Sequence, residues 1–422
     1  MQKRLRRLMC LIMVCMLAAL AVGCGKQAER STRITVVGWN TAADTFREQA
    51  AAFEKLHPDI KVDVQTVDSS YTRIMPRLTA GTDLPDVMVF QNRDFSTFLN
   101  RNEDAFLDLS SDFEDSRDRF VPASWEAVTK DGKIYGVPTD MGPAALFYRS
   151  DLFDKAGIKV DEIETWEDLI AAGKKLSAAT GGETVMLGTA EDTDFYDQLL
   201  NQAGGHYVSQ DDKTIVLNSA EGQKAMELMQ HMIKEGVLKN VGDWDGRLMA
   251  MKRSQIAAVP YGVWFAGNIS SSLPDQKGKW KIMPLPAIEK GGVRAANAGG
   301  SVVAIAANSR HKEAAIEFVK FCENTDEGEA IALKHGLFPA YTPIYKSQEF
   351  QKSDDYFGFA IYTMFAKVAE EIQPLHRGPI SLDSSKSTKE LIQNVIAGKD
   401  VKSSLDAAVR EIAEATGLKA GE

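Results

Sequence analysis

Residues 33–90 constrain the fold most strongly, because short apolar runs alternate there with segments of helical periodicity. The runs that predict strands are RITVVGW (Arg33–Trp39), IKVDVQTV (Ile60–Val67) and PDVMVF (Pro85–Phe90). A helix is predicted between the first two, ending at His57-Pro58, and a second helix over 71–79. This β-α-β-α-β order is typical of an α/β fold, with the uninterrupted apolar run of the third strand inside a parallel sheet.

The rest of the chain repeats this alternation, from a second unit that begins near residue 142. Helices are predicted over 165–176, 220–236 and 311–324, and strands over 254–262 and 301–308. The C-terminal part is predicted to be helical, with an apolar face formed by Val401, Leu405, Val409 and Ile412. A chain of 422 residues has room for two or three domains.

Residues 1–23 have the pattern of a secretory signal peptide. Four basic residues precede an uncharged apolar run over 8–22, which is shorter than the roughly 20 residues of a membrane-spanning helix. Gly23 and Cys24 resemble a bacterial lipobox, although Ala21 stands where such motifs usually have leucine. The resemblance implies that Cys24 is lipidated and that residues 24–32 form the anchored N-terminus and tether. The alternative is an ordinary cleaved signal followed by an unrelated cysteine.

The number of cysteines and the net charge limit the kinds of function that the chain can have. If the signal is removed and Cys24 is acylated, Cys322 is the one remaining thiol, so no intramolecular disulfide can form. Cys322 lies in the helix-like segment AAIEFVKFCEN, which predicts a packed core position. The formal charge is −10, and it becomes −14 when the four basic residues of the signal are removed. This negative balance argues against nucleic acid or anionic lipid as the ligand.

Common enzyme signatures are missing from the sequence. It contains no GxxxxGK[ST], no GxGxxG that opens a helix and no HExxH, and its six histidines are scattered. The acidic segment EDTDFYD (Glu191–Asp197) lacks the spacing and the glycine of a calcium loop, so a polar loop or an acidic helix start is predicted. No cofactor, metal site or catalytic residue is expected.

Several longer segments resemble the extracellular solute-binding proteins of family 1, the maltose-binding type. They are GKIYGVPTDMGPAALFYRSDLFDKAGI (Gly132–Ile158), TWEDL (Thr165–Leu169), AAVPYGVW (Ala257–Trp264) and AGGSVVAIAANSRHKEAAIEFVKF (Ala298–Phe321), in the family's order. The resemblance covers nearly all of residues 33–416. It implies a periplasmic-binding-protein-like α/β fold of type II, in which two α/β lobes are joined by a three-segment hinge.

The resemblance also implies how the chain divides and how it works. Lobe 1 would comprise residues 33–139 plus 301–341, and lobe 2 residues 140–300 plus 342–422. Such proteins hold a solute in the cleft between the lobes, close around it by hinge motion and deliver it to an ABC transporter permease. A monomer without catalytic activity is therefore expected, outside the cytoplasm and attached to a membrane through its lipid.

A sugar ligand requires flat aromatic side chains against its apolar face and short polar groups around its hydroxyls. Trp264 follows a predicted strand and matches the place of the family's stacking tryptophan. Trp39 and Asn40 end the first strand, where open α/β sheets place ligands. The other candidate ligand contacts are Gln91, Asn92, Arg93, Asp140, Tyr196, Gly299, Gly300 and Arg377.

Each of these candidates also has a purely structural interpretation. The aromatic residues could pack in the core, and Gly299 and Gly300 could serve only the geometry of the hinge. Arg93 departs from the acidic or aromatic residue that is usual at its position in the family. It could indicate an acidic sugar, or it could form an ion pair with a neighbouring carboxylate.

These observations predict a membrane-anchored lipoprotein that captures a carbohydrate, expected to be an oligosaccharide, for an ABC importer. One alternative is a lipid-anchored glycan hydrolase or lyase that uses two acids in the same cleft. A second keeps the fold but binds a peptide, a polyamine or a metal chelate. A third is a sensor or adhesin that presents the same domain to another partner.

Overall fold

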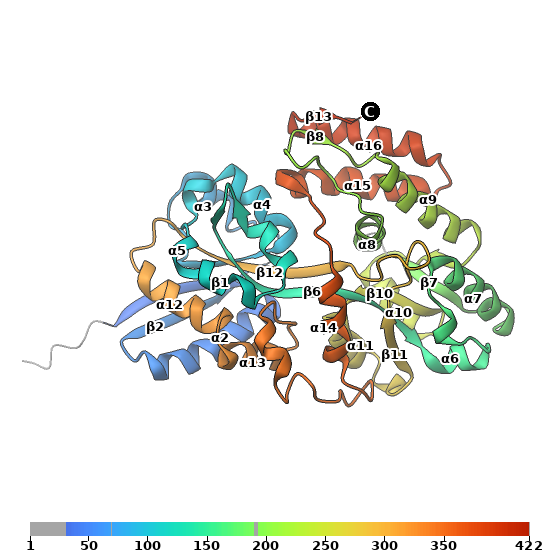
Figure 1. Cartoon of the computed structure of the whole chain (residues 1–422), viewed down its shortest axis with the longest axis horizontal. Helices are drawn as coiled ribbons and strands as arrows, with labels where there is room; N and C mark the ends of the chain where they lie inside the picture. The colour runs from blue at the N-terminus through green and yellow to red at the C-terminus, as the bar shows by residue number, and fades with distance from the viewer. Residues whose placement is uncertain (1–30, 69, 190–192, 422) are drawn as a thin grey trace, which may run out of the picture.

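The computed structural model describes residues 31–68, 70–189 and 193–421, which form two lobes joined by strands that run from one to the other (Figure 1). The predicted signal peptide and Cys24 lie outside these residues. Among the helices that are described, none combines the length and apolar character needed to cross a bilayer. The lipid anchor stays a prediction.

Lobe 1 contains the N-terminal β-α-β-α-β unit that the sequence predicts. Strand β1 pairs in parallel with β2 and β3, and β3 pairs antiparallel with β12. The helices α12 and α13 return from late in the chain to pack against α2. The elements of this lobe are β1 (Thr32–Gly38), α2 (Asn40–Leu56), β2 (Ile60–Thr66), α3 (Met75–Ala80), β3 (Val87–Gln91), α4 (Asn92–Arg101), α5 (Ser110–Phe113), β4 (Thr129–Lys130), β5 (Lys133–Ile134), α12 (Lys312–Glu323) and α13 (Asp326–Lys334).

Lobe 2 is built on β10, which pairs in parallel with β7 and antiparallel with the second half of β6. Helices α15 and α16 pack against each other and against α9. The elements of this lobe are α6 (Ser150–Lys155), α7 (Trp166–Ala179), β7 (Val185–Thr189), α8 (Asp194–Gln202), β8 (Thr214–Ile215), α9 (Ala220–Lys234), β9 (Leu238–Asn240), α10 (Trp244–Lys252), β10 (Ile256–Gly262), α11 (Phe265–Ser272), β11 (Trp280–Pro284), α14 (Ile361–Glu371), α15 (Ser381–Ile396), α16 (Val401–Thr416) and β13 (Lys419–Ala420).

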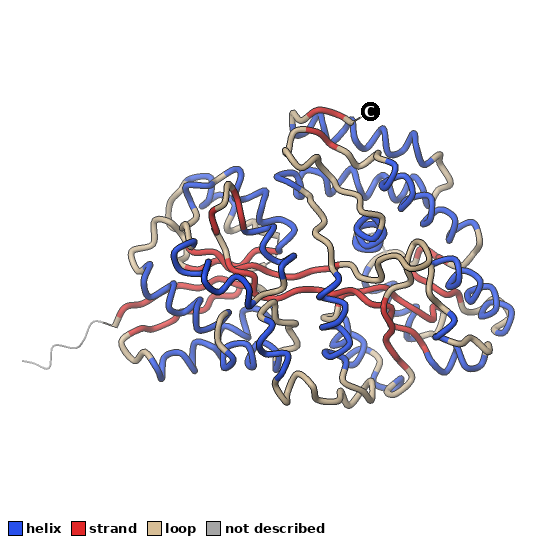
Figure 2. The backbone as a smooth tube through the Cα atoms, viewed as in Figure 1, coloured by secondary structure: helices blue, strands red, loops and turns tan. Residues whose placement is uncertain are grey.

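Two long strands, β6 (Val137–Arg149) and β12 (Asn297–Ile305), belong to both lobes (Figure 2). The first half of β6 pairs with β12, and its second half pairs with β10 and β11. Gly142 permits the close approach of the two strands, since a Cβ there would lie 2.3 Å from the carbonyl oxygen of Ala298. The lobes are therefore linked by hydrogen-bonded strands.

The hydrophobic core follows the two faces of this sheet. Alternate residues of β6 contribute to different clusters, with Phe147 on one face and Leu146 on the other, because successive side chains of a strand point to opposite faces. Cys322 is fully buried in the first cluster, which confirms its predicted packing role. Helix α7 begins at a capping box in which Thr165 and Asp168 satisfy each other's backbone N–H groups, as TWEDL predicts.

The predicted order of strands and helices is confirmed, but the starts of two elements differ by four residues from the prediction. The strand predicted over 301–308 is β12, which runs from Asn297 to Ile305. Helix α3 begins at Met75, whereas the sequence predicts a start at Tyr71, because Tyr71 has a left-handed backbone (φ 61°) that ends helical geometry there. The predicted lobe boundaries at 139/140 and 300/301 fall inside β6 and β12, and the boundary at 341/342 immediately precedes a short 3-10 helix. The exact division into lobes stays a prediction.

Candidate functional site

A cavity of about 640 Å³ lies between the lobes. Its volume falls within the range of about 300–1,000 Å³ that is usual for small-molecule sites. Most of its polar lining is contributed by α4, α8, β12, one short 3-10 helix (Pro122–Val128) and two connecting segments. These polar lining residues are Asn92, Arg93, Ser96, Glu126, Asp194, Asp197, Asn201, His206, Gln210, Asp212, Asn297, Gln373, His376 and Arg377. Within the described ranges, no group of three or more His, Cys, Asp or Glu side chains is arranged to hold a metal ion.

The lobe 1 wall is formed where β3 passes directly into α4. Strand β3 ends at Gln91 and the helix begins at Asn92, so the side chains of its first turn project from the carboxyl end of a buried strand. Open α/β sheets place ligand-binding groups at this edge. Asn92 and Arg93 both line the cavity, as their position after the PDVMVF strand predicts, and their contact with a ligand stays a prediction.

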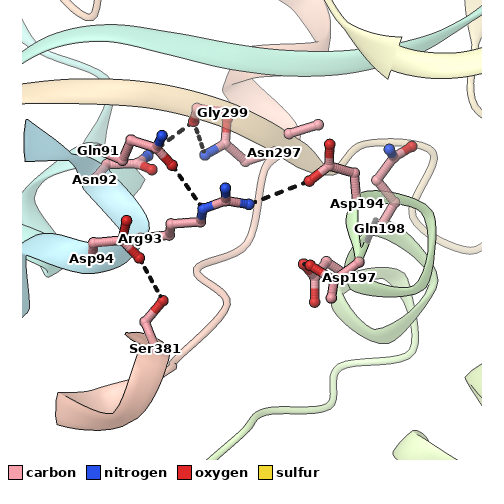
Figure 3. Close-up of polar contacts among 12 residues, drawn as sticks. Gln91, Asn92, Arg93, Asp94, Asp194, Asp197, Gln198, Asn297, Gly299 and Ser381 are labelled. Carbon is pink, nitrogen blue, oxygen red and sulfur yellow. Dashed lines mark hydrogen bonds and ion pairs between the residues drawn. The ribbon is translucent and has the colours of Figure 1, made fainter. Parts of the chain in front are cut away.

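Arg93 spans the cavity from lobe 1 to lobe 2 (Figure 3). Its Nε donates to Oε1 of Gln91 at 2.9 Å, which fixes the guanidinium beside its own strand. Its Nη1 reaches Oδ1 of Asp194 on α8 at 3.3 Å. The ion-pair interpretation of Arg93 is therefore confirmed. The ion pair explains the basic residue at this position without an acidic ligand.

The floor of the cavity is the glycine-containing part of β12. The carbonyl oxygen of Gly299 accepts from the side-chain amides of Asn92 at 3.0 Å and Asn297 at 2.9 Å (Figure 3). Gly299 and Gly300 have φ angles of 125° and 112°, which disfavour any other residue. A Cβ on Gly300 would also lie 2.7 Å from the carbonyl oxygen of Asp140. The hinge geometry thus requires both glycines, and Gly299 also lines the cavity.

The lobe 2 wall contains a buried ion pair. Nη2 of Arg377 lies 2.7 Å from Oδ2 of Asp197, whose Oδ1 accepts from the hydroxyl of Tyr207 at 2.6 Å. The guanidinium carbon also lies 4.7 Å from the Tyr207 ring centroid. Burial lowers the pKa of Arg377, but the charges of Asp197 and Tyr207 outweigh this and the net pKa is raised. Arg377, a weak candidate in the sequence, therefore lies firmly in the cavity wall.

The acidic segment that precedes α8 is an acidic helix start, as predicted. Asp194 is the first residue of α8, and both Asp194 and Asp197 face the cavity. Residues 191 and 192 of the same segment lie outside the described part of the chain. The carboxylates of Asp194 and Asp197 are therefore positioned by one helix turn and by their basic partners Arg93 and Arg377.

Trp264, the first aromatic candidate, lies at the hinge beside Ala298 and Gly299, which line the cavity, although it is not itself among the described lining residues. Nε1 of Trp264 donates to the carbonyl oxygen of Ala298 at 2.7 Å, so the indole rests against β12. Its ring is stacked with that of Trp244, with centroids 6.0 Å apart and an angle of 18° between the planes. Trp244 is 37% exposed, and sequence reasoning did not select it. Trp264 remains a candidate because it is only partly buried.

Trp39 lies after β1 and is partly buried, with its ring edge-on to Tyr71 at a centroid distance of 6.0 Å. It is not among the described residues that line the cavity. Asn40 is the first residue of α2, and its side chain lies outside the described part. Contact of either residue with a ligand stays a prediction.

Two predicted contacts, Tyr196 and Asp140, are not among the described residues that line the cavity. Tyr196 is fully buried in the core of lobe 2, because α8 turns this side chain inward while Asp194 and Asp197 face the cavity. Asp140 is 7% exposed and is packed inside the hinge, where it accepts hydrogen bonds from Ser301. Burial raises the pKa of Asp140 to about 6. In this arrangement neither side chain lines the cavity, and contact of either with a ligand stays a prediction.

Asp140 is one of three buried carboxyl groups that interact electrostatically. Glu323 ends α12 and Glu329 lies in α13, and burial raises the pKa of each well above its ordinary value. The charge of Asp140 raises both values further. Within the described ranges, Asp140 Oδ1, Glu323 Oε1 and both carboxylate oxygens of Glu329 have no hydrogen-bond partner. These groups are therefore poorly suited to carry charge.

Several lining residues were missed by sequence reasoning because they are brought together only by the fold. Glu126 and Asp212 both contact His376, although 250 and 164 residues separate the contacting pairs. No local pattern marks any of the three. For Asp194 and Asp197, the acidic segment at the start of α8 was a sequence signal of a possible site. It could not show the direction in which these side chains point.

Comparison with known proteins identifies the family. The sequence model of the bacterial extracellular solute-binding protein family matches residues 39–329. The chain is 29% identical over 390 residues to an arabinooligosaccharide-binding protein of Bacillus subtilis, covering 87% of this chain and 89% of that protein. It is 28% identical over 338 residues to a lactose-binding protein of Rhizobium radiobacter, with 77% and 79% covered.

Solved structures agree with this result. The binding protein of B. animalis subsp. lactis Bl-04, solved with β-1,6-galactobiose, superposes with a TM-score of 0.76 at 25% identity, covering 93% of this chain and 100% of that one. The sugar-binding protein MalE of Xanthomonas citri has the same fold, with a TM-score of 0.78 at 20% identity over 91% and 97% of the two chains. The chain therefore belongs to the family of bacterial extracellular solute-binding proteins.

Proposed function

We propose that this protein is the substrate-binding lipoprotein of a sugar ABC importer. It captures a short neutral oligosaccharide in the cavity between its lobes, outside the cytoplasm, and delivers it to a membrane permease. Cys24 carries the lipid that holds it at the membrane. The observation that carries the proposal is a cavity of about 640 Å³ whose charged groups are held in pairs across and along its walls.

Paired charges suit the recognition of sugar hydroxyl groups. Arg93 and Arg377 hold Asp194 and Asp197 in fixed orientations, so these carboxylates can accept hydrogen bonds from a ligand without first being ordered. The amides of Asn201 and Gln373 and the backbone of the floor add donors and acceptors that carry no net charge. This mixture matches a ring of hydroxyls, each of which both donates and accepts.

The balance of charge in the cavity argues against an anionic solute. Four carboxylates line it, from Glu126, Asp194, Asp197 and Asp212, against the guanidinium groups of Arg93 and Arg377 and the imidazole of His376. A uronic acid or a phosphate would therefore meet a net negative field. The names of relatives support a neutral sugar, since two of them bind arabinooligosaccharide and lactose, and a similar structure holds β-1,6-galactobiose.

A thermal-shift and calorimetric screen tests this proposal. The mature domain without Cys24 is mixed with arabinotriose, β-1,6-galactobiose, lactose, maltose, galacturonic acid and spermidine. A ligand that binds only the folded state stabilises it by about 2.7 kcal/mol at 100 times its dissociation constant. We expect stabilisation by one or more of the neutral sugars and none by galacturonic acid. Stabilisation by spermidine alone, or by nothing, would contradict the sugar assignment.

A matched pair of variants then locates the site. Arg93→Ala removes a guanidinium that lines the cavity, and Arg101→Ala removes one from the same helix that pairs with Asp383 outside the cavity lining. We expect the first variant to lower sugar affinity at least tenfold and the second to change it less than threefold. Equal losses would show that the inter-lobe ion pairs matter, and that Arg93 does not contact the sugar. New reducing ends after incubation with sugar would instead support a hydrolase.

A further inference from the structure

A second feature of the cavity is the position of His376, on the segment that connects α14 to α15. Its side chain is 17% exposed, and both ring nitrogens contact carboxylates. Nδ1 lies 2.8 Å from Oε1 of Glu126, and Nε2 lies 2.9 Å from Oδ1 of Asp212. A single imidazole therefore joins two acidic side chains at the edge of the cavity.

The two carboxylates come from opposite sides of the cavity. Glu126 lies in a short 3-10 helix (Pro122–Val128) of lobe 1, and Asp212 lies in the loop before β8 of lobe 2. His376 is held to lobe 2 by its backbone, since its carbonyl oxygen accepts from the Tyr207 N–H and its own N–H donates to Nδ1 of His206. If the lobes part, His376 stays with lobe 2 and the contact with Glu126 is broken.

This geometry requires two N–H groups on the ring. A neutral imidazole has one N–H donor and could satisfy only one carboxylate, leaving its other nitrogen lone pair against the second. An imidazolium donates to both. The hydrogen bond to Glu126 raises the pKa of His376, and this outweighs the opposing effect of burial. The charge of Asp212 raises the pKa further.

Neighbouring charged groups agree with a protonated His376. Burial and the charge of His376 lower the pKa of His206, which suits the acceptor role of its Nδ1. Glu126 and Glu221 of α9 oppose this effect on His206. The adjacent guanidinium of Arg377 is already paired with a carboxylate of α8 and is a cavity-lining cation next to the imidazole.

We propose that Glu126, His376 and Asp212 form a proton-dependent latch that favours the closed arrangement of the two lobes in mildly acidic surroundings. The closed form binds a proton more tightly than the open form, in which His376 has lost Glu126. In the open form Asp212 still contacts His376, so only the effect of Glu126 on the pKa is lost. Closure is therefore favoured fully below the pKa of the open form, and this advantage is lost as pH rises through the more strongly raised pKa of the closed form. Stronger solute capture at low pH follows from this, and that consequence rests on the proposed function.

Distance measurements on the ligand-free mature domain without Cys24 test the latch without any assumption about the solute. Spin labels on Ser111→Cys of lobe 1 and Ala397→Cys of lobe 2, both exposed positions, report the separation of the lobes by pulsed electron resonance. Cys322 is fully buried and is not expected to react. Between pH 5.5 and 8.5 we expect the ratio of closed to open molecules to fall about three- to tenfold, since each unit of pKa difference is worth tenfold and partial exposure weakens it.

Two variants and a matched control complete the experiment. His376→Gln and Glu126→Gln should each abolish the pH dependence of the distance distribution. His335→Gln is the control, because His335 contacts Glu48 at 3.0 Å within lobe 1 and does not cross the cavity. It should behave like the parent chain. A pH-independent distribution in the parent, or a dependence that survives in His376→Gln, would overturn the latch.

A calorimetric arm separates the latch from the proposed function. Affinity for β-1,6-galactobiose, or for whichever neutral sugar the screen identifies, is measured at the same pH values. A pH-dependent distance distribution without any sugar binding would uphold the latch and reject the sugar assignment. Sugar binding, together with a distance distribution that does not change with pH, would reject the latch and uphold the sugar assignment.

Discussion

The replacement Asp140→Asn tests the cost of burying a carboxyl group inside the hinge. Burial raises the pKa of Asp140 from 3.8 to about 6, against the opposing hydrogen bonds from Ser301. The folded chain therefore holds this proton more tightly than the unfolded chain does, and stability is lost as pH rises from 3.8 through 6. The difference corresponds to about 3 kcal/mol at pH 8, and asparagine, which cannot ionise, avoids it.

Urea unfolding of the two proteins at several pH values measures this effect. Linkage gives Asp140→Asn an advantage of about 1 kcal/mol at pH 4.5 and about 3 kcal/mol at pH 8, apart from a pH-independent offset due to altered hydrogen bonding. The diagnostic quantity is the growth of about 2 kcal/mol between these values. Asp115→Asn, at an exposed position of lobe 1, is the control and should show no growth. If the difference in the free energy of unfolding between Asp140→Asn and the parent did not change with pH, the reasoning would be refuted.

Three further substitutions have expected outcomes. Thr165→Ala removes the side chain that accepts from the Asp168 N–H at the start of α7, and urea unfolding should show a loss of about 1 kcal/mol; an unchanged midpoint would mean that the cap is dispensable. Gly299→Ala places a Cβ 2.8 Å from Nε1 of Trp264, at a backbone φ of 125°. The indole should therefore move, and its fluorescence maximum should shift. An unchanged fluorescence spectrum with full stability would contradict this close approach. Arg377→Ala leaves a buried carboxylate of α8 without its cation, and thermal unfolding at pH 7 should show a loss of about 3 kcal/mol; an unchanged unfolding temperature would mean that the ion pair does not stabilise the fold.

The order of elements in the fold could be predicted because it depends on local periodicity. The runs over 33–39, 60–67 and 85–90 became β1, β2 and β3, and TWEDL became a capped helix start. The start of α3 could not be predicted, because Tyr71 leaves helical geometry to place its hydroxyl against Asp94 and the Gln91 N–H. The backbone conformation of Tyr71 therefore depends on contacts with residues that are distant in the sequence.

The site could be predicted less well, because closeness to a strand end does not fix the direction of a side chain. Asn92 and Arg93 follow β3 and line the cavity, whereas Asp140 lies in a crossing strand and points into the protein. Tyr196 stands between two lining positions of α8 but lies on the buried face of that helix. His376 carries no local signal, since its partners come from two other parts of the chain.

The late position of β12 has a consequence for how the chain reaches this structure. Strand β3 pairs on one side with β1 and on the other with β12, and 207 residues separate Asn92 from the Gly299 oxygen that it contacts. Until residues 297–305 are available, β3 is an unpaired edge of apolar composition, which is a template for pairing with other chains. Such long-range closure slows folding and exposes incomplete chains to aggregation. A chain cut short before β12 should therefore aggregate rather than yield an isolated lobe 1.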